Sequence, residues 1–264
     1  MSNETKGVAL ITGASAGIGA TYADRLARRG YDLLLAARDA ARLEALAVRL
    51  RAETGVKVEV LQTDLTDKAS LGRLEARLRS DEAITLLVNN AGAASFGTFV
   101  ESDADRLEAL IDLNVVAVTR LANAAGAAFV KRGKGTIVNV GSVVGLLPEY
   151  RSVVYGATKA FVLHLSQALG LHLGPQGVYV QAVLPSATRT ELWGHAGVDV
   201  DTLTGVMEVD DLVDAALVGF DRREPVTIPP LHDAGQWAAF EAARRAMIPG
   251  FRQSRPADRY LANV

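Results

Sequence analysis

The segment KGVALITGASAGIG, residues 6–19, joins a run of apolar residues to a glycine-rich turn. The run from Gly7 to Thr12 is typical of a strand buried on both faces of a parallel sheet. A helical pattern then continues to Arg29 and ends at Gly30. A glycine turn between a strand and a helix exposes free N–H groups and the positive end of the helix dipole to an anion. The segment therefore predicts a nucleotide phosphate site formed by Gly13, Ser15, Ala16, Gly17, Ile18 and Gly19.

The same turn also fits a second pattern. Gly13 to Gly17 read Gly-x-Ser-x-Gly, the nucleophile elbow of α/β-hydrolases, with Ser15 as the nucleophile. Such an enzyme needs an acid and then a histidine later in the chain, and all four histidines follow Ser15. The elbow would, however, follow the first strand, where no earlier strand or loop could supply an oxyanion hole. A hydrolase using Ser15 therefore stays the alternative to nucleotide binding.

The end of the second apolar run indicates which nucleotide is bound. Residues 32–37, DLLLAA, predict a second strand, and Arg38 follows it. In dinucleotide-binding folds an acid at this point bonds the ribose 2′-hydroxyl, whereas an arginine accommodates a 2′-phosphate. The acid's place holds Ala37, so the sequence favours NADP(H) over NAD(H). The alternative is that Arg38 is a solvated residue at the start of the helix predicted over 39–53.

Strand and helix patterns alternate along most of the chain. Such alternation predicts one α/β domain over 1–264, a Rossmann-type doubly wound parallel sheet of about seven strands with helices on both faces. Ligands of such folds lie at the carboxyl ends of the strands. We expect Asp64 and Leu65 to meet an adenine there, with an N-cap or turn role as the alternative for Asp64. Asn90, Ala91 and Gly92 are expected to pack on a flat ring and to tie neighbouring strands together. The further predicted strands are 57–62, 84–88, 136–140, 178–184 and 226–228, and long helices are predicted at 101–131 and 152–173.

The segment from Ser142 to Lys159 contains a possible acid. Tyr155 and Lys159 are four residues apart on a predicted helix and so share one face. A free phenol has a pKa of about 10, and a neighbouring ammonium favours the phenolate. Ser142, at a strand end, could hold a carbonyl oxygen. Taken alone such a pair is usually a surface pair, and Asn114 within the helix 101–131 is usually an incidental polar residue.

Composition excludes several classes of function. The formal net charge is −2, so no electrostatic footprint for nucleic acid or for an anionic membrane is present. The chain has no cysteine, which removes disulfides, thiolate nucleophiles and cysteine-based metal sites. We therefore expect no metal site. We also expect a cytoplasmic protein, because the N-terminal apolar run is too short for a signal peptide. No apolar stretch reaches the length of a membrane-spanning helix without charges such as Arg120 and Lys131.

Together these motifs resemble the classical short-chain dehydrogenase/reductase family over residues 6–190. Thr12 to Gly19 is similar to the family's TGxxxGxG turn, and Asn89 to Gly92 to its NNAG motif. Ser142, Tyr155 and Lys159 match its catalytic set, and Asn114 falls where the family has a fourth catalytic residue. The resemblance implies an oxidoreductase that reduces a ketone or aldehyde, or oxidises a secondary alcohol, with NAD(P) (EC 1.1.1.-).

The resemblance also implies a role for each residue. Tyr155 is the general acid in reduction and Lys159 lowers its pKa and bonds the nicotinamide ribose, while Ser142 orients the substrate oxygen. Asn114 holds a water in a proton relay to Lys159. The chain departs from the family after the sixth strand, where Pro185 is followed by Ser186 in place of glycine; Thr188, or else Thr190, is expected to bond the nicotinamide amide. A non-catalytic dinucleotide sensor on the same fold is the alternative function.

The variable segments set the substrate and the assembly. The loop 190–207, the segment from Leu146 to Pro148 and residues 93–96 are largely apolar, which predicts a hydrophobic or acyl-type carbonyl substrate. We expect Leu147 and Trp193 to contact it beside Ser142 and Tyr155, and His195 to lie near substrate or solvent. A helical extension over 230–264 replaces the family's short ending. By resemblance we expect a homodimer or homotetramer formed through small and apolar residues of the two long helices: Ala117, Ala124, Ala125, Ala128, Phe161, Leu165, Ala168 and Leu169.

Overall fold

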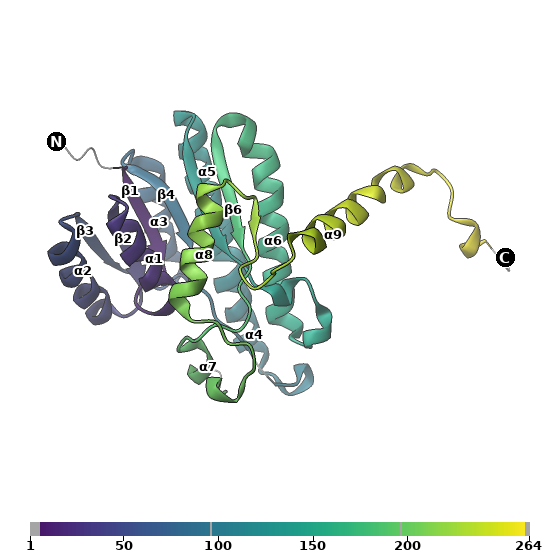
Figure 1. The fold of residues 1–264 in the computed structure, drawn as a ribbon, viewed down its shortest axis with the longest axis horizontal. Coiled ribbons are helices and arrows are strands. Elements are labelled where there is room, and N and C mark those ends of the chain that lie inside the picture. Colours follow the sequence, from purple (N-terminus) through teal and green to yellow (C-terminus); the bar gives the residue numbers. More distant parts are fainter. Residues whose placement is uncertain (1–5, 96, 196, 262–264) are drawn as a thin grey trace. The chain divides into compact units, whose positions relative to one another are not determined.

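The computed structural model describes residues 6–95, 97–195 and 197–261. The chain divides into two compact units, residues 1–230 and residues 231–264. The first unit contains a seven-stranded sheet in the order β3-β2-β1-β4-β5-β6-β7, and each neighbouring pair is parallel (Figure 1). The predicted doubly wound sheet is therefore confirmed. Its strands are β1 (Val8–Thr12), β2 (Asp32–Ala37), β3 (Val58–Gln62), β4 (Ile84–Asn89), β5 (Gly135–Val140), β6 (Val178–Val183) and β7 (Val226–Thr227).

Helices cover both faces of this sheet because β1 and β2 are apolar on both sides. Ala9 and Ile11 of β1 belong to one core cluster with Tyr22, and Leu10 belongs to the other with Phe129. The first cluster contains residues of α1, α2 and α8, and the second contains residues of α3 and α5. The helices of this unit are α1 (Gly17–Arg28), α2 (Ala40–Thr54), α3 (Lys68–Ser80), α4 (Ala104–Ile111), α5 (Val118–Arg132), α6 (Val153–Leu173), α7 (Leu192–His195) and α8 (Val209–Asp221).

Helix ends follow the expected chemistry. Asp39 caps α2 by accepting a hydrogen bond from the Arg42 N–H, and Asp67 caps α3 in the same way through Ser70. Gly55 ends α2 in the left-handed region, at a φ of 74°, which only glycine adopts without strain. Short 3₁₀ helices occupy Phe99–Glu101, Val143–Gly145, Pro148–Tyr150, Gly174–Gln176, Val200–Thr202, Ile248–Arg252 and Asp258–Tyr260.

The long helix predicted over 101–131 is present as one helical run from Ala104 to Arg132, but it contains a π-helical turn that the sequence did not predict. The chain forms α4, then a π-helical segment at Asp112–Ala117, and then α5. The π-helical turn contains Asn114, whose side chain bonds to a neighbouring loop. By length and composition the run from Ala104 to Arg132 could cross a membrane in spite of Arg120, but 56% of its most apolar window is buried within the protein. The α5 part of this run packs against α3 and the sheet, as a core helix does.

The second unit is the helical extension that the sequence predicts. Helix α9 (Ala234–Ala246) begins at Asp233, whose side chain accepts a hydrogen bond from the Gly235 N–H. Trp237 and Phe240, one turn apart, stack with ring centroids 5.4 Å apart. Glu241 is paired with Arg244 and Arg245 one turn later. None of the residues that carry the predicted chemistry lies in this unit.

Candidate active site

A cavity of about 1120 Å³ lies at the carboxyl ends of β1, β2, β4, β5 and β6. The structure brings most of the predicted site residues together on its wall. Those that line it are Gly13, Ser15, Ala16, Gly17, Ile18, Arg38, Asp64, Leu65, Asn90, Ala91, Gly92, Ser142, Tyr155, Lys159, Pro185, Thr188 and Trp193. Gly19 and Asn114 lie behind the wall, and both act through the residues that they support.

The glycine turn has the geometry of a phosphate cradle. Gly13 and Gly17 have φ values of 66° and 54°, a region that side chains disfavour. A β-carbon on Gly19 would lie 2.3 Å from the Gly13 carbonyl oxygen, so the turn cannot close around any larger residue. Helix α1 has no side-chain cap and no acidic residue in its first turn. Its N–H groups therefore face the cavity without a competing anion, as a diphosphate requires.

Asn90 fixes this turn to the end of β4. Its side-chain N–H group donates to the carbonyl oxygens of Thr12, at 2.9 Å, and Gly13, at 3.2 Å. The Thr12 hydroxyl accepts in return from the backbone N–H groups of Asn90 and Ala91. Behind them the buried Asn89 side chain donates to Asn139 of β5 at 2.9 Å. The amides of this motif thus tie neighbouring strands together, one of the two roles expected of them.

Two arginines lie where the adenosine half of a dinucleotide would reach. Arg38 follows β2, is exposed and forms no ion pair within the described residues. Arg42, which the sequence analysis did not single out, is engaged by Asp39 and by Glu191 at 2.6 Å. Asp64 lines the same region, and the Thr66 hydroxyl and N–H that donate to it lower the pKa of its carboxyl. Arg38 is therefore the arginine left available for a phosphate.

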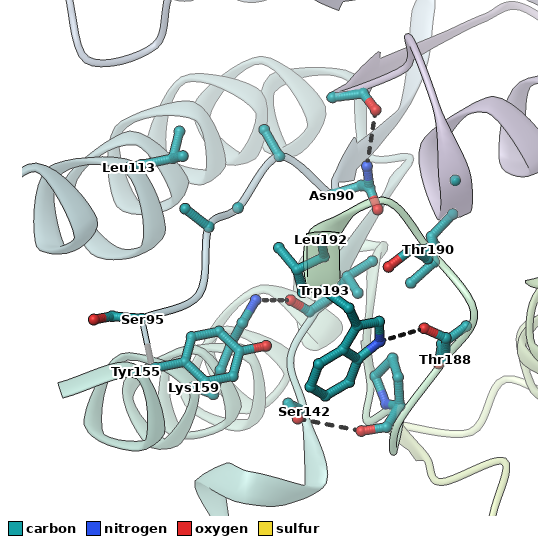
Figure 2. A pocket seen from close by; sticks show the side chains of 18 of the residues that line it. Asn90, Ser95, Leu113, Ser142, Tyr155, Lys159, Thr188, Thr190, Leu192 and Trp193 are labelled. Atoms are coloured by element: carbon teal, nitrogen blue, oxygen red, sulfur yellow. Dashed lines mark hydrogen bonds between the residues drawn. The ribbon is translucent and has the colours of Figure 1, made fainter. Parts of the chain in front are cut away.

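Helix α6 presents Tyr155 and Lys159 on one side, with Ser142 nearby (Figure 2). The Ser142 hydroxyl donates to the Pro185 carbonyl oxygen at 3.2 Å, which joins the ends of β5 and β6. The Lys159 ammonium donates to the Val140 carbonyl oxygen at 2.9 Å. Burial lowers the pKa of Lys159 to about 8, because desolvation penalises the charged amine.

The pKa of Tyr155 differs from the sequence expectation. Burial raises it to about 12, and hydrogen bonding with Ser142 acts in the opposite direction. The expected lowering by Lys159 is not seen, because the Val140 carbonyl holds the ammonium 5.7 Å from the centre of the Tyr155 ring. At neutral pH the phenol therefore retains its proton, which is the form that a general acid needs.

Asn114 organises the loop that faces Lys159. Its side chain accepts from the Ala93 N–H at 3.0 Å and donates to the Ala93 carbonyl at 2.9 Å and to the Thr158 hydroxyl at 3.1 Å. Gly92 lies between Asn114 and Lys159: a β-carbon there would be 3.2 Å from the Asn114 amide oxygen and 3.5 Å from the Lys159 amine. Thr158, a buried hydroxyl one position before Lys159, was not predicted from the sequence.

The loop after β6 places both candidate threonines on the cavity. The Thr188 hydroxyl donates to Ser186, so the Pro-Ser turn is closed by a local hydrogen bond. Thr190 lies against the glycine turn, 3.3 Å from where a Gly17 β-carbon would be. The Trp193 indole N–H donates to the Thr188 carbonyl oxygen at 2.7 Å (Figure 2). Trp193 thereby joins the substrate loop to the turn that the nicotinamide would contact.

One residue expected to contact the substrate lies apart from the cavity lining. Leu147 is 44% exposed and does not line the cavity. The short helices at Val143–Gly145 and Pro148–Tyr150 turn the chain so that residues 150–154 form the wall instead. Phe96 and the side chain of His195, also expected near the substrate, lie outside the described residues. Among the described residues that line the cavity there is no histidine that could serve as a base for Ser15.

Comparison with known proteins agrees with the geometry. The family model described as short chain dehydrogenase matches residues 7–200, and the chain belongs to the short-chain dehydrogenase family. A short-chain dehydrogenase from Sphingobium yanoikuyae, solved in complex with NADPH, is 62% identical, with a TM-score of 0.94 over 96% of this chain and 98% of that one. A bulky-bulky ketone specific alcohol dehydrogenase from Comamonas testosteroni is 54% identical, with a TM-score of 0.90 over 97% and 98%. An uncharacterised oxidoreductase from Staphylococcus saprophyticus is 31% identical over 84% of this chain and 94% of its own.

Proposed function

We propose that this oxidoreductase is an NADP(H)-dependent reductase of bulky hydrophobic ketones, which it forms from secondary alcohols in the reverse direction. The observation that carries the proposal is the single cavity in which a phosphate cradle, Arg38, and the Ser142, Tyr155 and Lys159 side chains face one another. The similar Sphingobium structure contains NADPH, and the similar Comamonas enzyme is named for ketones with two bulky substituents.

The residues present fit NADP(H). Gly13 and Gly17 admit a diphosphate, and the unpaired Arg38 is available for a 2′-phosphate where Ala37 replaces the usual acid. Pro185, Thr188 and Ala91 line the inner part of the cavity, where a nicotinamide ring would lie. When bound, the cofactor supplies the hydride, so the chain needs neither a nucleophile nor a metal.

The chain's own residues position the ketone and supply the proton. Ser142 and Tyr155 are placed to donate hydrogen bonds to the ketone oxygen, and the phenol of Tyr155 gives up its proton as negative charge develops there. The Lys159 amine, which lies close to Gly92 and Asn114, stabilises the phenolate that forms. A proton then returns to Tyr155 through the polar groups that Asn114 holds.

The lining of the outer cavity supports a bulky substrate. Its side chains are largely apolar and come from three separate segments: residues 99–113, residues 150–153 and the loop 190–207. They include Phe99, Leu107, Leu113, Tyr150, Val153, Leu192, Trp193 and Leu203. Such a surface gains free energy from burying aryl and long alkyl groups.

The test is a panel of aryl alkyl ketones of increasing size, assayed with NADPH by cofactor absorbance and by quantifying the alcohol. We expect the oxidation of NADPH to match alcohol formation, with kcat/KM rising as the second substituent grows from methyl to butyl. A protein that binds NADPH but turns over no ketone, aldehyde or alcohol would instead be the dinucleotide sensor. Turnover confined to small carbonyls would contradict the proposed substrate class.

A further inference from the structure

The segment that leads into helix α6 forms one wall of the cavity, and it contains a cation, Arg151. Residues 150–154 line the cavity immediately before the catalytic Tyr155. Tyr150, Val153 and Val154 are the apolar part of this wall, while Arg151 and Ser152 are polar. The sequence analysis assigned no role to either residue.

Arg151 has a backbone conformation that arginine disfavours. Its φ is 53° and its ψ 18°, in the left-handed region. Arg223 is the other non-glycine residue with a positive φ among the described residues, and its guanidinium packs 5.1 Å from the centre of the Tyr179 ring. Arg151 forms no ion pair, side-chain hydrogen bond or ring contact within the described chain. The Arg151 N–H closes the 3₁₀ turn by donating to the Pro148 carbonyl oxygen, but no described contact of the guanidinium explains why an arginine occupies this left-handed position on the cavity wall.

The neighbouring hydroxyl is also without a partner. The Ser152 hydroxyl oxygen is buried, yet no group within the described residues bonds to it. A buried hydroxyl without a hydrogen bond is uncommon, because it has lost its water without compensation. Ser152 lines the cavity three residues before Tyr155, so a bound molecule could supply the missing partner.

The charge of Arg151 is not balanced at its end of the cavity. The acidic residues that line the described cavity are Asp39, Asp64 and Glu191. Asp39 and Glu191 pair with Arg42, and Asp64 accepts from Thr66 beside Arg38. All three belong to the cofactor side. Glu149, although close in sequence to Arg151, does not line the cavity.

We propose that Arg151, assisted by the Ser152 hydroxyl, binds a carboxylate on the substrate, so that the preferred ketones are hydrophobic oxo acids. The carboxylate sits at the far end of one ketone substituent, and the guanidinium neutralises it at the solvent-exposed edge of the wall. The inference rests on the proposed function, because it names the class of ketone that the same site selects. It makes Arg151 and Ser152 specificity-determining residues, and neither residue takes part in the proton transfer.

The experiment compares phenyl oxo acids, with two, three or four methylene groups between ketone and carboxylate, with their methyl esters. The wild-type protein is expected to reduce at least one acid with a higher kcat/KM than its ester. Arg151→Leu should lower kcat/KM for that acid about tenfold or more, the loss expected for a charged hydrogen bond, and leave the ester within about twofold. Arg151→Lys should restore most of the difference, and Ser152→Ala should lower the acid preference by a smaller factor.

Arg222→Leu is the matched control, because it removes the same charge from a side chain that is 71% exposed and is not among the residues that line the cavity. It should leave the acid preference unchanged. Arg151→Gly adds a readout that does not depend on turnover: relief of the left-handed backbone should raise the melting temperature, by about 2 °C, while the acid preference is lost.

Equal losses for acids and esters in Arg151→Leu would show a structural role and overturn the proposal. An unchanged acid preference in Arg151→Leu would do the same. In both cases the wild-type protein would still reduce the esters with NADPH, so the proposed function would stand. Failure of the wild-type protein to reduce any ketone would instead refute the proposed function itself.

Discussion

At the scale of single residues, two arginines beside the cavity, Arg38 and Arg42, differ in whether their charge is available to bind a cofactor phosphate. Arg38 is exposed and unpaired beside the cavity, whereas Arg42, one helical turn later, is held by Asp39 and Glu191. The sequence singled out Arg38 by its position after a strand. It gave no reason to discount Arg42, because the partner Glu191 lies far along the chain in a loop.

Arg38→Asp should change the choice of cofactor. A carboxylate repels a 2′-phosphate and can bond a ribose 2′-hydroxyl, so kcat/KM for NADPH should fall about 100-fold and that for NADH should rise. Steady-state rates with both cofactors at one saturating ketone concentration measure the change. Arg42→Ala is the control and should shift the ratio by less than about threefold. A preference for NADPH that survives Arg38→Asp would show that another group binds the phosphate.

At the scale of elements, the π-helical turn between α4 and α5 places Asn114 behind the cavity wall. The extra residue in such a turn redirects side chains, and π-helical turns are frequent at functional sites. All of the described hydrogen bonds of the Asn114 side chain are made with Ala93 and Thr158. Its contribution is therefore to hold the loop from Asn90 to Ala93 against Lys159.

Asn114→Ala should weaken both the fold and the reaction. It leaves the N–H and carbonyl groups of Ala93 without partners, which should lower the free energy of unfolding by about 1–3 kcal/mol. The displaced loop should also lower kcat more than it raises KM for NADPH. Urea unfolding and steady-state kinetics measure the two effects. Thr158→Val removes one of these hydrogen bonds and should lie between the variant and wild type; an Asn114→Ala protein as stable as wild type would disprove the role in holding the loop.

The elements also show how far the sequence can predict this site. Local patterns in the sequence predict the succession of strands and helices along the chain, the glycine turn at Gly13 and the shared helical face of Tyr155 and Lys159. No local sequence pattern marks the π-helical turn, because the hydrogen bonds of Asn114 that accompany it are made with a loop about twenty residues earlier. Likewise, Arg151 reaches the wall, and Leu147 leaves it, through two short 3₁₀ turns that no apolar period encodes.

At the scale of the whole molecule, burial of Lys159 opposes folding. The folded protein lowers the pKa of this amine from 10.5 to about 8. Below pH 8 the folded state must hold a buried charge that the unfolded state keeps in water, so stability is reduced there. As pH rises from about 8 to about 10.5 the unfolded chain binds more protons than the folded one, and this contribution to stability rises.

Lys159→Met should consequently stabilise the protein at neutral pH while abolishing ketone reduction. The expected gain in the free energy of unfolding at pH 7 is about 1–3 kcal/mol, after the loss of the hydrogen bond to Val140. The gain should shrink toward zero at pH 10. Urea unfolding of both proteins at the two pH values gives the difference directly. A variant less stable than wild type at pH 7 would contradict the assigned cost of burial.

We propose that the protein assembles as a homodimer or homotetramer through the outer faces of α5 and α6. Of the small residues expected there, Ala117, Ala124 and Ala125 lie in the core of the subunit and are not available. On α6, Phe161, one of the expected residues, is 37% exposed, and Leu171, which was not among them, is 83% exposed. Light scattering during size exclusion tests the assembly, and Leu171→Glu together with Phe161→Glu should lower the mass toward that of one chain; a wild-type monomer would refute it.

The central claim is that Tyr155, held by α6 beside Ser142 and Lys159, is the proton donor for ketone reduction. Tyr155→Phe tests it most directly, because it removes one hydroxyl and leaves the apolar ring. The account predicts that kcat for an accepted ketone falls about 1,000-fold, as expected for loss of a general acid, while the Kd for NADPH changes less than about threefold. Turnover within about tenfold of wild type, with cofactor binding intact, would contradict it.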